Sequence, residues 1–257
     1  MKLLTAIVLT GIMMFLGVIA WSGYMLWDIY SQRAHSRAVY DQMLAYSPLV
    51  VASHTANPEP VSHRPVWGGY VNPSIANLQA SYDSAVGWLS ISNTTLSHPF
   101  VQGQDNSFYL HRDINHQQSS AGTIFMDYRN CQDFSDFHTL IYGHNMNDGS
   151  MFAPLAGFSN RDFFTVNQQG HIFLPHTTYL VEWFAFAIIA PDDPVVYWPQ
   201  IETLEERWYF LRYMKRIGLH VCQEVSVTPQ DRVVTLSTCR NDRANSRMVL
   251  VGVLREL

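Results

Sequence analysis

From residue 86 to the C-terminus, apolar residues occur in short runs, which glycine, proline, asparagine and aspartate separate. The runs are too short for the helices of a bundle, and they are rich in β-branched and aromatic residues, which favour strands. Their number and spacing predict a mainly β domain, built as a barrel or a sandwich. The runs cover residues 87–91, 100–103, 108–111, 122–128, 139–144, 170–175, 178–189, 234–239 and 247–254.

Two segments have a helical pattern instead. Residues 73–82 predict a short helix with Ile75 and Leu78 on one face. Residues 201–218 predict a longer helix between the seventh and eighth apolar runs. Thr203 and Glu206 have the spacing of a capping box at its start, and Gly218 is a natural stop. The apolar face predicted for this helix consists of Ile201, Leu204, Trp208, Leu211 and Ile217.

The N-terminal segment predicts a membrane anchor. Residues 3–27 contain no charged side chain, and about 20 such residues cross a bilayer. A cleavable signal peptide has a shorter apolar region, of about 7–15 residues, although Ile19-Ala20 would serve as a loose cleavage site. We therefore expect an uncleaved transmembrane anchor over residues 1–28. A helical stalk and a proline-rich linker should follow over residues 29–71, before the mainly β domain over residues 72–257.

Composition removes several classes of function. The net charge is −5, and the 16 basic residues form no patch interleaved with aromatics, so nucleic-acid binding has no support. The chain has no glycine-rich nucleotide motif and no histidine and cysteine spacing that suits zinc, so we expect no cofactor and no metal. Three cysteines are too few for a disulfide framework. Cys131 and Cys222 are interpreted as small buried apolar residues, with an extracellular disulfide between them as the alternative.

Three residues suggest nucleophilic chemistry. Cys239 ends the strand-like run VVTLSTC and precedes a polar loop, where a thiol is partly accessible and nearby positive charge would favour the thiolate. Arg247 opens the next apolar run and could donate two hydrogen bonds to an oxyanion. His144 ends the run TLIYGH, where a polar side chain can face a cleft. Each residue alone also has an ordinary structural interpretation: a buried strand cysteine, a packing histidine and a solvated arginine.

The motifs resemble those of a known family. TLSTC with a downstream arginine that opens a hydrophobic strand, together with YGHNM upstream, resembles the catalytic motifs of sortases, the membrane-anchored cysteine transpeptidases of Gram-positive bacteria. Residues 86–113 and 121–130 look like the early barrel strands of class B. The segment 201–218 is similar to the helix of that class between strands six and seven. The resemblance covers roughly residues 72–257.

The resemblance implies an eight-stranded sortase-type β-barrel with N-terminal helices and one helix between strands six and seven. It implies Cys239 as the nucleophile, His144 as the general acid and base, and Arg247 as the group that stabilises the substrate carbonyl or oxyanion. Two positions depart from the usual class B pattern. Arg240 stands where an acidic residue is common, and Cys131 stands where asparagine is more usual. The positions that match the class B substrate groove are Asn106, Leu110 and Ser237.

The implied reaction cleaves a C-terminal sorting motif of secreted proteins and joins the new acyl end to an amine of cell-wall peptidoglycan or of a pilin subunit. The implied location is the cell membrane, with a single span, a cytoplasmic N-terminus and an extracellular catalytic domain. Two alternatives remain open at this point. One is a membrane-tethered cysteine hydrolase that releases peptide to water, and the other is a non-enzymatic β-domain that binds a surface protein. The sequence does not specify the sorting motif.

Overall fold

The computed structural model describes residues 2–48, 71–239 and 245–257. The chain divides into two compact units, Met1–Asp41 and Gln42–Leu257. Helix α1, Lys2–Met43, accounts for nearly all of the first unit. Within the described residues, one helical stretch, Ile7–Tyr46, is long enough to cross a membrane and contains an 18-residue window with a mean hydropathy of 1.8. The expected stalk is helical as far as α1 extends, whereas the expected proline-rich linker falls mostly on residues 49–70, outside the described residues.

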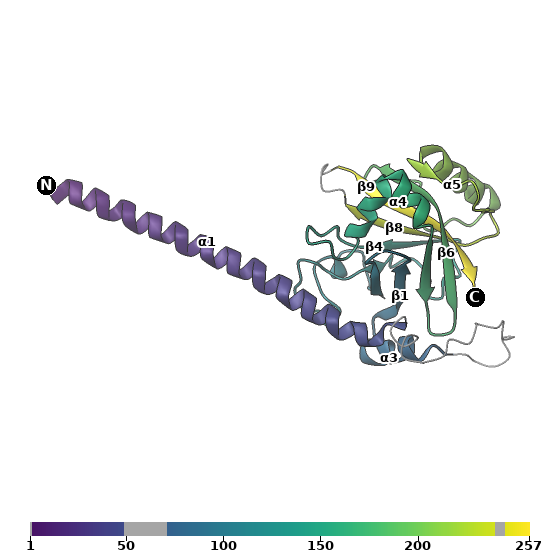
Figure 1. Cartoon of the computed structure of the whole chain (residues 1–257), viewed down its shortest axis with the longest axis horizontal. Helices are drawn as coiled ribbons and strands as arrows, with labels where there is room; N and C mark the ends of the chain where they lie inside the picture. The colour runs from purple at the N-terminus through teal and green to yellow at the C-terminus, as the bar shows by residue number, and fades with distance from the viewer. Residues whose placement is uncertain (1, 49–70, 240–244) are drawn as a thin grey trace. The chain divides into compact units, whose positions relative to one another are not determined.

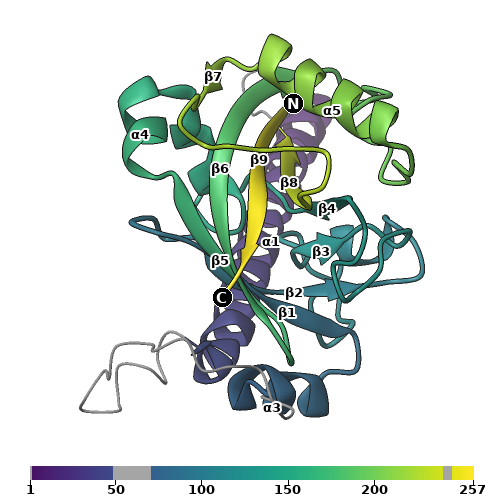
Figure 2. The ribbon, with the colours of Figure 1, turned by 90° about the vertical axis from the view of Figure 1, so that its right-hand side faces the viewer.

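In the described part of the second unit, nine strands form one sheet in the order β5-β1-β2-β3-β4-β8-β9-β6-β7. Strand β5 pairs with both β1 and β6, so eight of these strands close into a barrel, and β7 adds to the edge of β6 (Figures 1 and 2). The predicted eight-stranded barrel is therefore confirmed. The strands are β1 Ala85–Ile91, β2 Ser97–Gln102, β3 Phe125–Met126, β4 His138–Tyr142, β5 Gln169–Phe173, β6 Thr178–Ile189, β7 His220–Val221, β8 Val233–Cys239 and β9 Arg247–Glu256.

Short helices connect the strands. Helix α3, Pro73–Ser81, begins where the Asn72 side chain accepts hydrogen bonds from the backbone of Ser74 and Ile75. Ile75 and Leu78 are fully buried on one face of α3, as predicted. The other helices among the described residues of the second unit are η1 Leu44–Tyr46, η2 Phe108–Leu110, η3 Ala153–Ser159, α4 Arg161–Val166 and α5 Leu204–Ile217.

Helix α5 confirms the predicted ends and part of the predicted face, because Leu211 and Ile201 are buried. Thr203 and Glu206 form the capping box, and the helix ends at Gly218. However, Leu204 and Trp208, which were assigned to the apolar face, are about half exposed. The residues of α5 that are buried are Phe210, Leu211 and Met214. The spacing of the apolar residues fits two overlapping apolar faces on this helix. Which of the two faces is buried depends on how the helix lies on the barrel.

The run 108–111 was predicted to be a strand and forms the 3₁₀ helix η2 instead. The Asp105 carboxylate accepts hydrogen bonds from the backbone N–H groups of Ser107 and Phe108, which turns the chain just before this run. The run is apolar because Tyr109 is buried, not because the backbone is extended. The run 122–128 likewise contributes only the two-residue strand β3.

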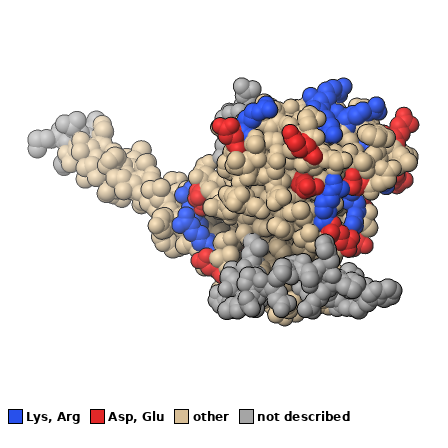
Figure 3. All heavy atoms as spheres, turned by 45° about the vertical axis from the view of Figure 1, so that its right-hand side comes forward, with Lys and Arg blue, Asp and Glu red and all other residues tan. Residues whose placement is uncertain are grey.

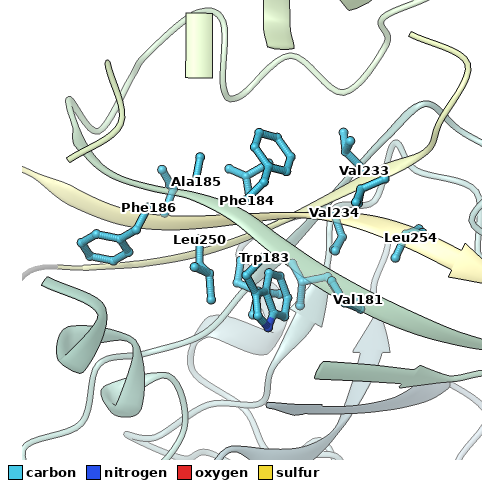
Figure 4. Close-up of a cluster of buried hydrophobic side chains, with 14 of the residues drawn as sticks. Val181, Trp183, Phe184, Ala185, Phe186, Val233, Val234, Leu250 and Leu254 are labelled. Carbon is cyan, nitrogen blue, oxygen red and sulfur yellow. The ribbon is translucent and has the colours of Figure 1, made fainter. Parts of the chain in front are cut away.

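The core lies where β6, β8 and β9 meet (Figure 4). Trp183, Phe184 and Phe186 on β6 are fully buried, and so are Val234 on β8 and Leu250 on β9. Neighbouring residues of a strand point to opposite faces, so burial of both Ala185 and Phe186 means that the second half of β6 is covered on both sides. This explains why residues 183–189 form a continuous apolar run without alternation.

The barrel surface in Figure 3 carries basic and acidic side chains interspersed with each other. One mixed cluster near the C-terminus consists of Arg255 with Glu182, at 3.0 Å, and Asp231, at 2.6 Å. Charge is therefore balanced locally at this cluster.

Candidate active site

Strands β8 and β9 place a cysteine and an arginine opposite each other. The two strands are antiparallel neighbours, and in their register Cys239 pairs with Arg247. Residues directly opposite on antiparallel strands have Cα atoms about 4.5–5.5 Å apart. Cys239 is the last residue of β8 and Arg247 is the first residue of β9, so this pair lies at one end of the barrel strands.

Strand β4 brings a histidine to the same end. β4 runs parallel to β8, with Tyr142 paired to Ser237, and the Gly143 N–H donates to the Ser237 carbonyl at 3.2 Å. His144 follows Tyr142 by two residues, as Cys239 follows Ser237. Parallel neighbours end at the same edge of a sheet, so the backbone positions of the three predicted catalytic residues meet at one edge. His144 reaches this edge from a segment about a hundred residues before the other two.

The imidazole of His144 is oriented by a backbone carbonyl. Its Nε2 lies 2.7 Å from the carbonyl oxygen of Leu110, and the ring is partly buried. A carbonyl can only accept, so this contact assigns a proton to Nε2 and leaves Nδ1 for exchange with another group. The predicted groove residue Leu110, at the end of η2, therefore contacts the predicted acid and base through its main chain. The ring of His111 lies nearby, with its centroid 6.1 Å from that of His144.

The side chain of Arg247 is also partly buried. Its Nη1 donates to the carbonyl of Ser246 at 3.2 Å. A guanidinium has five N–H donors in a planar group that suits an oxyanion, and this contact uses one of them.

A second layer behind the histidine is built around Asp127, which directly follows β3. Its fully buried carboxylate accepts from Arg129 Nη2, Asn106 Nδ2 and the Tyr142 hydroxyl, each at 2.8 Å. Burial alone would raise the pKa of Asp127, but hydrogen bonds from Arg129, Tyr142 and Asn106 lower this pKa below its ordinary value. The pKa of Arg129 is raised, mainly by its hydrogen bond to Asp127. The pair is therefore ionised.

The same layer extends to Ser237. The rings of Tyr142 and Tyr197 stack with their centroids 6.3 Å apart, and the Tyr197 hydroxyl lies 2.8 Å from Ser237 Oγ. Burial, followed by the charge of Asp127, raises the pKa of Tyr142, so this hydroxyl keeps its proton. Ser237 is only 3% exposed and its hydroxyl meets Tyr197. Asn106 and Ser237, which were selected from separate segments of the sequence, thus belong to one connected network.

Sequence reasoning did not identify Asp127, Arg129, Tyr142 or Tyr197. A partial signal was present, because the run 122–128 ends in Asp-Tyr-Arg-Asn directly after apolar residues, and Tyr142 stands two residues before His144. Nothing local to those segments indicates that they meet.

The cysteine predictions need one correction. Cys131 and Cys222 are both free thiols. Cys222 is buried as expected, and its Sγ donates to Glu224 at 3.1 Å. Cys131 is exposed, and it lies in a turn where its backbone N–H donates to the Asp136 carboxylate. Arg240, the departure next to Cys239, lies outside the described residues. Among the described residues, no group of three His, Cys, Asp or Glu side chains is placed to hold a metal ion.

Comparison with known proteins agrees with this geometry. The family model of the sortase domain matches residues 89–255. Sortase B of Listeria monocytogenes is 33% identical over 241 residues, which is 93% of each chain, and sortase B of Staphylococcus aureus is 26% identical over 232 residues, 90% of this chain and 89% of the other.

Solved structures agree as well. A Staphylococcus aureus sortase B–substrate complex superposes with a TM-score of 0.75 at 25% identity, over 88% of this chain and 99% of the other. The structure of sortase B from Listeria monocytogenes gives a TM-score of 0.62 at 35% identity, over 69% of this chain and 98% of the other. The barrel, the motifs around His144 and Cys239, and these similarities lead to one conclusion. The chain belongs to the sortase family of cysteine transpeptidases, and within it to class B.

Proposed function

We propose that Cys239 is the nucleophile, that His144 is the general acid and base, and that Arg247 holds the oxyanion, in a reaction that cleaves a sorting motif of secreted proteins. The observation that carries this proposal is the strand register, in which Cys239 pairs with Arg247 across β8 and β9 while β4 delivers His144 to the same edge. Membership of the sortase family sets aside the non-enzymatic β-domain.

The reaction proceeds in two balanced steps. The Cys239 thiolate attacks a peptide carbonyl carbon, and the negative charge on the carbonyl oxygen is held by the Arg247 guanidinium. The C–N bond then breaks, the leaving amine takes a proton from the His144 imidazolium, and a thioester remains. An incoming amine attacks the thioester, gives its proton back to His144 and releases the thiolate. Nδ1 of His144 is the nitrogen that exchanges this proton, because Nε2 is held by the Leu110 carbonyl.

The proposed location is the outer face of the cell membrane, with helix α1 as a single-span anchor and the N-terminus in the cytoplasm. The supporting observation is that large apolar side chains of α1, including Phe15, Leu16 and Trp21, are more than half exposed. In water this surface would be unfavourable, whereas lipid would cover it. The proposed acceptor is an amine of cell-wall peptidoglycan, with a pilin lysine as the other candidate.

The test uses the full-length chain in detergent with a pentapeptide library and two amines, a glycine peptide and a lysine peptide. Mass spectrometry should detect an acyl-enzyme and a ligated product with one of the amines. Cys239→Ala should lose both species, with turnover reduced by at least about a thousandfold because the nucleophile is absent. Cys131→Ala is the matched control, since it removes an exposed thiol outside the site and should retain turnover.

Two results would contradict the proposal. Turnover that persists in Cys239→Ala would exclude this residue as the nucleophile. Release of peptide to water at a rate that neither amine alters, with no ligated product, would identify a hydrolase.

A further inference from the structure

Asp127 carries more hydrogen bonds than a structural ion pair requires. In the described structure its carboxylate accepts three from the backbone N–H, Nε and Nη2 of Arg129, one from Asn106 and one from Tyr142. Burial of a charge is costly, and Arg129 alone would neutralise it. One of the two additional donors, Tyr142, ends β4 two residues before His144, and the other, Asn106, stands four residues before Leu110, whose carbonyl contacts His144.

Asn106 is held at both ends of its amide group. Its Nδ2 donates to Asp127 Oδ2 at 2.8 Å, and its Oδ1 accepts from the backbone N–H of Tyr128 at 3.1 Å. A carboxylate can only accept and a backbone N–H can only donate, so these two contacts assign which end is oxygen and which is nitrogen. The side chain is partly exposed, and its second amide hydrogen has no partner among the described residues. Asn106 therefore presents one N–H donor outward.

We propose that Asp127 is a positioning residue, which locks the amide of Asn106 so that its remaining N–H donates to a carbonyl of the bound sorting peptide. This inference rests on the proposed function. Without the carboxylate, only the backbone N–H of Tyr128 would oppose a rotation of the amide that presents its oxygen to the peptide, and two carbonyl oxygens repel each other. Asp127 thus acts through Asn106 and does not itself contact the peptide.

The first test is a double-mutant cycle on the full-length chain, with the pentapeptide that the wild type turns over fastest. Asn106→Ala should raise KM about threefold to tenfold, the value of one lost hydrogen bond, with a smaller change in kcat. Asp127→Asn should raise KM by a similar factor in the wild-type background, but by less than about twofold when Asn106 is already alanine. Equal factors in both backgrounds would overturn the proposal, since they would mean that Asp127 affects KM without Asn106.

A matched control separates positioning from general stability. Asp231→Asn also removes a carboxylate that pairs with an arginine, Arg255, but at the start of β8, at the opposite end of the strand from Cys239. It should lower the melting temperature and leave KM unchanged. A rise in KM for Asp231→Asn equal to that for Asp127→Asn would show that loss of stability alone explains the effect, which would also overturn the proposal.

Asp127→Glu covers the case in which Asp127→Asn does not fold. It retains the charge and the pairing with Arg129 but moves the carboxylate by one methylene, so KM should still rise in the wild-type background and not in Asn106→Ala. An unchanged KM in Asp127→Glu, with Asp127→Asn unfolded, would indicate a structural carboxylate only.

The second test needs no peptide. In a chain labelled with ¹⁵N-asparagine, the two side-chain protons of Asn106, assigned by their loss in Asn106→Ala, should differ in shift because one of them donates to a carboxylate. Asp127→Asn or Asp127→Glu should change that difference. An unchanged Asn106 signal overturns the positioning role even if the chain turns over peptide. Absence of turnover with every library peptide overturns the proposed function, and the Asn106 signal still decides whether Asp127 holds the amide.

Discussion

Two histidines, His98 on β2 and His138 on β4, are buried, and burial lowers the pKa of each to about 4. His138 is anchored by Thr235 Oγ1, 2.8 Å from its Nε2, and its ring centroid lies 4.4 Å from that of Phe210. Both rings are therefore neutral in the folded protein near pH 7. They differ from His144, which is partly exposed and contacts a carbonyl at the candidate site.

These buried rings predict an acid-sensitive fold. Between pH 6.5 and about 4 the unfolded chain binds a proton at each ring and the folded chain does not, so the free energy of unfolding falls as the pH falls through this window. Each ring contributes at most about 3 kcal/mol of this loss. His171, whose pKa burial also lowers, adds in the same direction. The measurement is urea unfolding at several pH values.

His138→Gln is the matching variant for this prediction. It removes one titrating ring while an amide can still reach Thr235, so the dependence of unfolding free energy on pH should become shallower. A free energy of unfolding that is flat between pH 6.5 and 4.5 in the wild type would refute the argument.

At the scale of single elements, α5 shows how much local chemistry determines. The Glu206 carboxylate accepts from the backbone N–H of Thr203 at 2.9 Å, and the Thr203 hydroxyl accepts from the backbone N–H of Glu206 at 3.2 Å. Acidic residues occupy the first turn and Lys215 and Arg216 the last, which suits the helix dipole. All of these interactions lie within a few residues along the chain, so the sequence predicts both ends of the helix.

Thr203→Ala should destabilise the protein by about 1 kcal/mol, because the first turn of α5 loses its side-chain acceptor. Thr203→Ser is the control, since it retains the hydroxyl and should stay within a few tenths of a kcal/mol of the wild type. Guanidinium unfolding followed by circular dichroism measures both. Equal stability of the alanine and serine variants would mean that the capping box contributes little.

At the scale of the whole molecule, barrel closure depends on β6, which pairs with β5 on one edge and with β9 on the other. The register of β6 with β9 shifts between Trp183 and Ala185, and Gly252 on β9 pairs with Trp183. A Cβ at Gly252 would lie 2.5 Å from Val181 Cγ1 and 2.6 Å from Trp183 Cε3. The absence of a side chain at Gly252 therefore lets the large indole fill the barrel at the point of closure.

Gly252→Ala should destabilise the protein by about 1–3 kcal/mol through overpacking. Val181→Ala should cost less in the Gly252→Ala background than in the wild type, because it removes the methyl group that the new Cβ meets. Thermal unfolding of the four proteins measures this coupling. Additive losses in the double variant would show that Gly252 is not constrained by Val181.

The sequence by itself determined what depends on neighbours along the chain. It predicted the barrel strands as apolar runs, the ends of α5 from its capping box, and α3 with its buried face. The same reasoning wrongly predicted a strand at η2, because an apolar run does not by itself require an extended backbone. It also assigned the exposed Trp208 to the buried face of α5, because two faces of that helix are partly apolar.

Only the tertiary structure decided which distant segments meet. The register of β4 with β8 and of β8 with β9 brings the positions of His144, Cys239 and Arg247 to one edge, and it places the Asp127 network behind them. Such contacts depend on hydrogen-bond ladders and on burial between segments far apart in sequence. The physical reason is that a buried carboxylate is stable only when its donors converge on it. Two donors of Asp127, Asn106 and Tyr142, come from a loop and a strand whose spacing in the chain carries no sign of their meeting.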